Sequence, residues 1–226
     1  MIEIFSQNGI ELDEKKEQLF EKYYDLLVEY NKRFNLTAIT ERNEVYLKHF
    51  VDSALAIEFI KGGSLIDIGS GGGFPAIPIK IMNPDIELTM LEATGKKCEF
   101  LKTVALELGL DGVTVLNGRA EDLAKDVRYR ERFDYCTARA VARLNTLTEY
   151  CLPFVKVGGN FIALKGDAEE EIREAENAIK VLGGSIKFSK NYLLSGAKRC
   201  IIQIKKIKAT DKKYPRGNGK ERKNPL

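Results

Sequence analysis

Hydrophobic positions along the chain follow a helical period first and a strand period afterwards. Over residues 11–34, leucines and tyrosines recur at helical spacing among Glu and Lys, which predicts a long amphipathic helix. After a polar break, Thr40 is placed to cap a second helix that runs to about Phe59 and ends at two glycines. Residues 1–62 are too few for a separate stable domain, so we expect a helical extension packed on the rest of the chain.

From residue 63 to residue 207, short apolar runs alternate with helical patterns. The strand-like runs lie at 65–68, 86–91, 113–116, 133–137, 160–164, 185–188 and 200–207. The helical patterns lie at 75–81, 96–108, 144–154 and 168–182. This alternation predicts an α/β domain with a mostly parallel sheet and helices on both faces. Only residues 191–198 separate the last two strands, so we expect an antiparallel hairpin to complete a seven-stranded sheet.

A glycine-rich segment follows the first predicted strand and leads into a helix expected to start near Pro75. A strand, a glycine turn and a helix open many folds that bind nucleotides or cofactors. A dinucleotide fingerprint would need a glycine where Phe74 stands, and Asp67 disfavours a pyrophosphate because like charges repel. A cationic ligand without phosphate suits the turn, and S-adenosyl-L-methionine is one. The alternative is a bare tight turn, which rarely needs four glycines.

Further candidates follow the carboxyl ends of later strands, where open α/β sheets bind their ligands. Glu92 lies 23 positions beyond Gly69, and its carboxylate is placed to accept both ribose hydroxyls of an adenosine. The segment 117–122 is placed to contact the adenine. Arg139 follows the fourth strand, where a cation can clamp a phosphate, a base or a carboxylate. Lys165 ends the fifth strand on the same rim and is a candidate for positioning a substrate. An equally weighted alternative is a lysine whose apolar stem packs on the protein while its charge stays in water. By analogy of fold, these features favour a class I, Rossmann-like S-adenosylmethionine-dependent methyltransferase.

One histidine and four cysteines bear on other chemistries. His49 lies one helical turn from Asp52 and Ser53, which favours a hydrogen-bond cluster on one helix face over a base or a metal ligand. The cysteines are scattered, so we expect no metal site and a reducing cytoplasm. Cys136 and Cys151 fall in apolar patterns and are expected in the core, which leaves no evident cysteine nucleophile.

Charge is unevenly distributed along the 226 residues. The net charge is +3, yet residues 205–226 hold nine Lys or Arg and two acids, a local charge of +7. A basic segment on a mildly acidic body favours a polyanionic partner such as RNA, with a solvated, disordered tail as the alternative. Deleting this basic C-terminal tail, residues 208–226, is expected to weaken RNA binding and to spare cofactor affinity. We expect no membrane partner, because no apolar run approaches a membrane span and no signal peptide is evident.

Seven short motifs together resemble one known family. They are Asn31-Lys32-x-Phe34-Asn35-Leu36-Thr37, His49-Phe50-x-Asp52-Ser53, Asp67-Ile68-Gly69-x-Gly71-Gly72-Gly73-Phe74-Pro75, Gly118-Arg119-Ala120-Glu121, Ala138-Arg139-Ala140-Val141, Leu164-Lys165-Gly166 and Lys212-Lys213-Tyr214-Pro215-Arg216. They resemble the RsmG (GidB) family of 16S ribosomal RNA guanine-N7 methyltransferases over nearly the whole chain. The glycine motif is widely shared, whereas the Ala-Arg-Ala-Val, His-Phe-x-Asp-Ser and Tyr-Pro-Arg runs are more particular. Small departures are Glu92-Ala93-Thr94 and Lys96-Lys97, where Asp-Ser and Lys-Arg are common.

The resemblance implies methyl transfer from S-adenosyl-L-methionine to N7 of one loop guanosine in small-subunit rRNA, with S-adenosyl-L-homocysteine as the product. Its cofactor contacts fall on Gly69, Phe74, Ala120, Glu121 and Arg139, to which the arguments above add Gly71 and Glu92. We expect no certain catalytic residue beyond the positioning candidates Arg139 and Lys165. The expected partner is the rRNA or the small ribosomal subunit, bound by a monomer through Lys212, Lys213, Arg216, Lys220, Arg222 and Lys223.

Three other functions stay open on the sequence alone. A nicotinamide-dependent dehydrogenase is disfavoured by the absent third glycine. A methyltransferase that acts on a protein or a small molecule is weakly disfavoured by the basic tail. A non-catalytic RNA-binding assembly factor on the same fold is disfavoured by the intact cofactor motifs.

Overall fold

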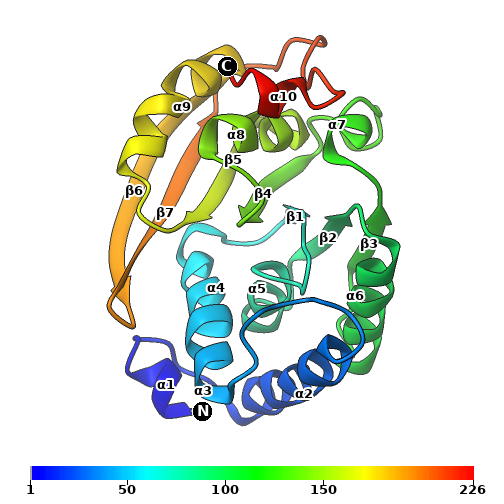
Figure 1. Ribbon diagram of the computed structural model, residues 1–226, viewed down its shortest axis with the longest axis vertical. Helices are drawn as coiled ribbons and strands as arrows, with labels where there is room; N and C mark the ends of the chain where they lie inside the picture. The colour runs from blue at the N-terminus through cyan, green and yellow to red at the C-terminus, as the bar shows by residue number, and fades with distance from the viewer. Residues whose placement is uncertain (1) are drawn as a thin grey trace.

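A computed structural model describes residues 2–226 and contains a seven-stranded sheet in the order β3-β2-β1-β4-β5-β7-β6 (Figure 1). The strands are β1 (Ser64–Ile68), β2 (Glu87–Glu92), β3 (Val113–Asn117), β4 (Phe133–Arg139), β5 (Val155–Lys165), β6 (Gly184–Leu194) and β7 (Ala197–Lys206). Strands β1 to β5 pair in parallel, whereas β7 is antiparallel to both β5 and β6. The predicted Rossmann-like, seven-stranded α/β fold with a terminal hairpin is confirmed.

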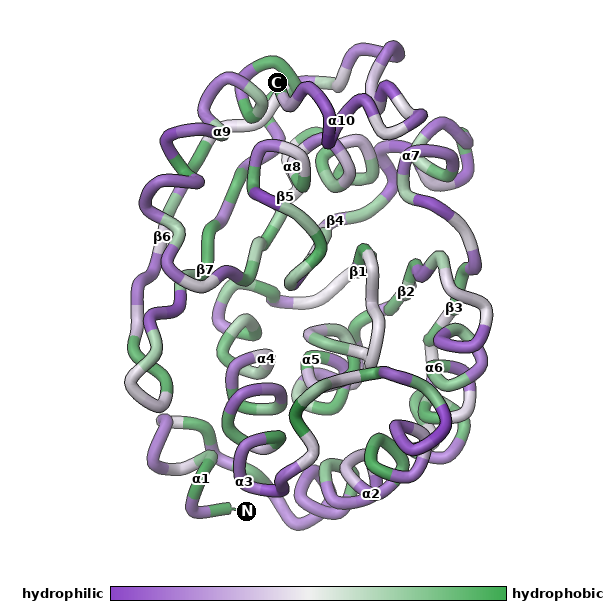
Figure 2. The backbone as a smooth tube through the Cα atoms, viewed as in Figure 1, coloured by the Kyte–Doolittle hydropathy of each residue, from purple (hydrophilic) through white to green (hydrophobic). Residues whose placement is uncertain are grey.

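Helices cover both faces of the sheet and enclose a core on each side. The helices that follow β1 to β5 are α5 (Ala76–Met82), α6 (Gly95–Glu107), α7 (Ala120–Leu123), α8 (Leu144–Cys151) and α9 (Glu169–Val181). Successive residues of β1 point to opposite faces of the sheet. Leu65 belongs to the core that includes α5 and α6, and Ile66 belongs to the core that includes α8 and α9. Figure 2 shows the hydrophobic positions gathered on the central strands and the inward sides of these helices. None of the helices in residues 2–226 is long and apolar enough to cross a bilayer.

The N-terminal region adds aromatic side chains to the core that holds α5 and α6. Its elements are α1 (Ile2–Ser6), α2 (Glu14–Asn31), α3 (Arg42–Val45), a π-helical turn (Tyr46–Val51), α4 (Asp52–Ala54) and a 3-10 turn (Leu55–Phe59). The rings of Phe20 and Tyr23 on α2 lie 5.1 and 5.0 Å from that of Phe50. The predicted cap at Thr40 is wrong by one residue, because the Glu41 carboxylate accepts hydrogen bonds from the first backbone N–H groups of α3.

The terminal hairpin is longer than the sequence indicates. Strands β6 and β7 run to a turn at Ser195 and Gly196, both with positive φ, whereas the prediction left residues 191–198 outside the strands. Residues of β6 lie in half-buried or exposed positions between its two buried ends, and its many Lys, Ser and Asn residues give no apolar alternation in the sequence. The short helices α1, α7 and α10 (Lys220–Lys223) were not predicted, because four or five residues carry no helical period.

The segment after β7 folds back along the sheet and packs against α8 (Figure 1). The Arg216 guanidinium forms hydrogen bonds of 3.0 and 2.7 Å with the carboxylate of Glu149, a side chain with 1% exposure on α8. Tyr214 and Glu221 are buried as well. Figure 2 shows α10 as hydrophilic, although Glu221 in its first turn faces the interior. Residues 208–226 therefore belong to the packed fold in this structure.

We expect Tyr23→Phe to destabilise the protein by about 1–3 kcal/mol, because the buried Tyr23 hydroxyl donates a hydrogen bond to the Gly72 carbonyl of the glycine turn. Tyr24→Phe is the matched control, since its hydroxyl bonds the Thr40 carbonyl in an exposed position, and we expect less than about 0.5 kcal/mol. Urea unfolding measures both changes. Equal unfolding midpoints for the two variants would show that the Tyr23 bond does not tie α2 to the turn.

Candidate cofactor and acceptor site

The glycine turn after β1 needs backbone conformations and close contacts that favour glycine. Gly69, Gly71 and Gly73 have φ of +71°, +54° and +92°. The N–H groups of Gly69 and Ser70 donate to the Leu91 carbonyl at 2.8 and 3.2 Å, which fixes the turn against β2. A Cβ at Gly69 would lie 2.7 Å from a methyl of Val141. The turn is thus packed closely beneath the loop that follows β4.

Glu92 lies at the end of β2 and joins that turn to the start of α6. One of its carboxylate oxygens accepts from the Gly71 N–H at 3.0 Å, and the other accepts from the Thr94 N–H at 2.8 Å. Each carboxylate oxygen has more than one lone pair, so both can accept a further donor. The side chain is therefore held in place while it keeps capacity for ligand hydroxyls.

Two cavities meet at the glycine turn and contain the predicted cofactor residues. The first, of about 280 Å³, is lined by Ile68, Gly69, Leu91, Glu92, Ala93, Gly118, Arg119, Ala120, Glu121, Ala140, Val141, Tyr150 and Arg222. The second, of about 260 Å³, is lined by Leu36, Thr37, His49, Gly69, Ser70, Gly71, Gly72, Phe74, Lys97, Arg139 and Ala140. Gly69 and Ala140 belong to both cavities. All seven predicted cofactor residues thus line one or both of these two neighbouring cavities.

The loop after β4 separates the two cavities and is held from below. Ala140 has φ of +57°, a left-handed conformation that is uncommon for a residue with a side chain. The Lys165 ammonium donates to the Ala142 carbonyl at 2.8 Å and lies 2.7 Å from a Glu171 carboxylate oxygen. Lys165 is therefore paired within the protein, and it positions this loop.

Asp67 is fully buried behind the glycine turn and lines neither cavity. One carboxylate oxygen accepts from the Thr137 hydroxyl at 2.7 Å, while the other has no hydrogen-bond partner. Burial raises the pKa of this carboxyl to about 7, against the opposing effect of its hydrogen bonds. The sequence argument placed this carboxylate against the ligand, whereas the structure leaves it able to act only through its charge.

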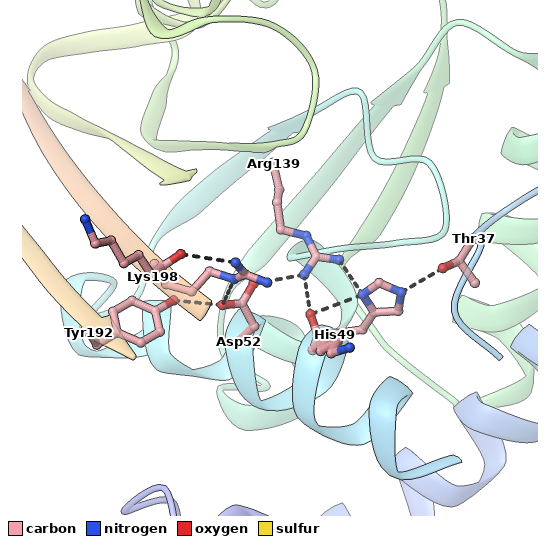
Figure 3. Close-up of polar contacts among 8 residues, drawn as sticks. Thr37, His49, Asp52, Arg139, Tyr192 and Lys198 are labelled. Carbon is pink, nitrogen blue, oxygen red and sulfur yellow. Dashed lines mark hydrogen bonds and ion pairs between the residues drawn. The ribbon is translucent and has the colours of Figure 1, made fainter. Parts of the chain in front are cut away.

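Arg139 is the centre of a polar network that joins four segments (Figure 3). Its Nη1 donates to the Lys48 carbonyl and to the Asp52 carboxylate, both at 3.1 Å. Its Nη2 lies 3.2 Å from Nδ1 of His49, and since arginine only donates, that Nδ1 is the acceptor. The proton of His49 therefore sits on Nε2, which lies 2.7 Å from the Thr37 hydroxyl.

His49 is held neutral by its surroundings. Burial, followed by the charge of Arg139, lowers the pKa of the imidazole to about 3. The ring also stacks on Phe74 with centroids 4.5 Å apart. The predicted cluster of His49 with Asp52 and Ser53 is wrong, because the π-helical turn widens the helix here and His49 bonds Thr37 and Arg139 instead.

A third cavity of about 380 Å³ adjoins the second and shares His49, Arg139 and Ala140 with it. Its other lining residues are Ile39, Lys48, Asp52, Leu164, Lys165, Gly166, Asp167, Glu171 and Arg199. The Asp52 carboxylate supports one side, since it accepts from the Tyr192 hydroxyl of β6 at 2.8 Å and lies 3.6 Å from Nε of Arg199 on β7. The network in Figure 3 thus forms the boundary between this cavity and the second one.

The six basic residues predicted to bind RNA lie in different environments. Lys212, Lys213, Lys220 and Lys223 are exposed. Arg216 forms an ion pair with Glu149, so it is not the free cation that the prediction of an RNA contact assumed. Arg222 lines the first cavity beside Tyr150. Sequence reasoning assigned no role to Tyr150, Val141 or Lys97, because ordinary helix and loop patterns give no sign of the cavities that they line.

All four cysteines are buried and unpaired, including Cys136 and Cys151 as predicted. Residues 2–226 contain no group of three His, Cys, Asp or Glu side chains arranged to hold a metal ion.

The sheet order is that of the Rossmann-like fold shared by class I methyltransferases, and the cavities lie at the carboxyl ends of its strands. Solved methyltransferase structures share the architecture. Precorrin-6y C5,15-methyltransferase from Geobacter metallireducens superposes with a TM-score of 0.53 at 13% identity, covering 68% of this chain and 87% of that one. TYW2 from M. jannaschii in complex with AdoMet gives 0.54 at 13% identity, covering 70% and 76%.

The chain belongs to the rRNA small subunit methyltransferase G family, whose model matches residues 16–199. The Ribosomal RNA small subunit methyltransferase G of Lactobacillus johnsonii is 48% identical over 99% of both chains. That of an Exiguobacterium species is 46% identical over 100% of this chain and 97% of its own. The family resemblance seen in the motifs is thereby confirmed.

We expect the His49 imidazole to stay neutral throughout pH 5–8, because its pKa lies near 3. His49 is the sole histidine of the chain, so its ring proton gives one resolved NMR signal in protein without a histidine tag. The chemical shift should be flat in the folded protein and should titrate near pH 6.5 in urea. A midpoint between pH 5 and 8 in the folded state would contradict the assigned bonds to Arg139 and Thr37.

Proposed function

We propose that this protein transfers a methyl group from S-adenosyl-L-methionine to N7 of a loop guanosine in small-subunit (16S) ribosomal RNA. The observation that carries the proposal is the group of three adjoining cavities, two at the glycine turn and one beyond Arg139. The first two suit the two ends of the methyl donor and the third suits a nucleobase. Family membership supports the RNA class of acceptor.

The proposed cofactor position follows the cavity linings. The adenosine would occupy the first cavity, with Glu92 at its ribose and Ala120 and Glu121 at its adenine. The methionine end would occupy the second cavity, beside Gly69, Gly71, Phe74 and Arg139. A guanidinium suits the carboxylate of that end, and buried Asp67 offers a negative charge near its cationic centre. These residues fit a zwitterionic sulfonium ligand better than a pyrophosphate.

The proposed reaction asks the protein to position its substrates rather than to move protons. The sulfonium supplies an activated methyl group, and N7 of guanine offers an in-plane lone pair with no proton to remove. The neutral His49 is consistent with this, since a ring with a pKa near 3 is a poor general base. Alignment within adjoining cavities can supply roughly 7–11 kcal/mol through effective concentration alone.

The proposed acceptor is an unpaired guanosine in the third cavity. A-form RNA hides N7 in a deep, narrow groove, so a loop nucleotide is the accessible target. Lys165 and Arg199 on the cavity wall lie beside the carboxylates of Glu171 and Asp52, so groups of both charges line the proposed acceptor position. The exposed Lys212, Lys213, Lys220 and Lys223 would contact phosphates around it. We propose that the protein acts as a monomer in the cytoplasm.

The direct test is methyl transfer from radiolabelled S-adenosyl-L-methionine. The acceptors are small ribosomal subunits from a strain that lacks the modification, subunits already modified, and deproteinised rRNA. We expect label only on unmodified acceptors, at one guanosine that chemistry selective for 7-methylguanosine can cleave. Label on proteins, or none on any acceptor while cofactor binding is intact, would refute the proposed reaction and favour a protein substrate or a non-catalytic role.

We expect Gly71→Asp to abolish cofactor binding and leave the protein folded. The position has φ of +54°, and a Cβ would meet nothing closer than the Gly69 carbonyl at 3.8 Å, so the carboxylate has room within the second cavity. There it would displace the methionine end of the ligand. Gly109→Asp is the matched control, with φ of +59° and open space far from the site. Calorimetric titration with S-adenosyl-L-methionine should separate the two variants, and equal affinities would contradict this placement.

A further inference from the structure

The end of the chain reaches the first cavity. After β7 the segment runs along α8, and α10 lies beside that helix near α7 (Figure 1). Arg222 in α10 and Tyr150 in α8 both line the cavity that faces Gly118, Ala120 and Glu121. Sequence reasoning assigned Arg222 to RNA from its charge alone, whereas the structure places it at the candidate adenosine position.

Side-chain bonds of two arginines hold this end of the chain in place. The Arg130 guanidinium donates to the carbonyls of Thr210, Asp211 and Tyr214 at 2.8, 3.1 and 2.9 Å. The Arg216–Glu149 pair adds a bidentate contact of low exposure. Such networks fix the chain path, because breaking them would leave a buried charge without a partner.

Two further contacts fix the orientation of α10 itself. The Thr146 hydroxyl of α8 donates to the Glu221 carbonyl at 2.9 Å. The Glu221 side chain is fully buried, and its carboxylate accepts from the Gly217 N–H. The next residue, Arg222, lines the first cavity together with Tyr150 of α8. Arg222 and the adjacent Lys223 are both exposed, but Lys223 lines none of the three cavities.

The chemistry of Arg222 suits a planar base better than it suits a structural role. It takes part in none of the ion pairs among residues 2–226. A guanidinium can stack on an aromatic face and donate to ring nitrogens, and adenine offers both. Opposite it, Glu121 is already paired with Arg119 at 2.7 Å, so Arg222 is the cation left to meet a ligand in this cavity.

We propose that Arg222, positioned by the packed C-terminal segment, forms the outer wall of the adenine pocket and binds the nucleobase of the methyl donor. The inference rests on the proposed function for the identity of the ligand. It makes residues 208–226 part of the cofactor site. The expectation that their deletion spares cofactor affinity is therefore replaced by an expected loss.

The test compares Arg222→Ala with Lys223→Ala, which removes the same charge one residue away. We expect Arg222→Ala to weaken binding of S-adenosyl-L-methionine about tenfold, and Lys223→Ala to leave it within about twofold. Arg222→Lys should recover only part of the loss, because an ammonium lacks the planar face. Binding is measured by calorimetry, without RNA, on variants whose thermal unfolding matches the wild type.

A second ligand tests whether Arg222 contacts the adenine rather than the amino-acid end of S-adenosyl-L-methionine. 5′-Methylthioadenosine keeps the adenosine and lacks the amino-acid end, so Arg222→Ala should weaken its binding by the same factor. Equal affinities of the two alanine variants for both ligands, or a loss confined to binding of ribosomal subunits, would overturn the inference in favour of an RNA contact. A wild-type protein that binds neither ligand would instead refute the proposed function, so the two failures are distinguishable.

Discussion

The buried ion pair between Arg139 and Asp52 is the contact on which the arrangement of the site depends. The two side chains are 15% and 5% exposed, and between them they bond the π-helical turn, the end of β4 and the terminal hairpin. Removing one partner of such a pair leaves a charge buried, which commonly costs 3–5 kcal/mol. The guanidinium that the cofactor is expected to meet is thus also a structural element of the site.

The same contact explains why the N-terminal region is needed for the site. The second and third cavities take Thr37, His49 and Asp52 from this region and their remaining walls from the strand ends. Stacking of His49 on Phe74 and the bond from Tyr23 to Gly72 connect the region to the glycine turn from the other side. The turn is held between this layer and the loop after β4, whose Val141 contacts it above Gly69. Positions that would be loose on an isolated sheet are therefore preorganised before any ligand binds.

Features of this structure that depend on neighbouring residues in the sequence can be predicted, whereas features that depend on contacts between distant residues cannot. Strands β1 to β4 and the turn at Gly69 are set by local hydrophobic runs and glycine spacing, so they are predictable. The bonds of His49 to Thr37 and Arg139 depend on a π-helical turn and on a contact 90 residues away, and neither leaves a local pattern. The cofactor role proposed for Arg222 has no sign in the sequence for a related reason. The sequence of a basic segment gives only its net charge. Which of its cations lack an acidic partner depends on the fold, here on the burial of Glu221 and on the Arg216–Glu149 pair.

The distribution of charge in the site also fits one kind of chemistry. Of its titratable groups, His49 is kept neutral, Lys165 is paired with Glu171, and Asp67 is sealed behind the turn with a raised pKa. None of these is an exposed group poised to exchange a proton near neutral pH at the face of the third cavity. An acceptor that must lose a proton would need such a group, whereas an acceptor with a free lone pair needs only alignment. The arrangement therefore suits the proposed attack by an unprotonated ring nitrogen, which depends on Arg139 and the glycine turn being held in place.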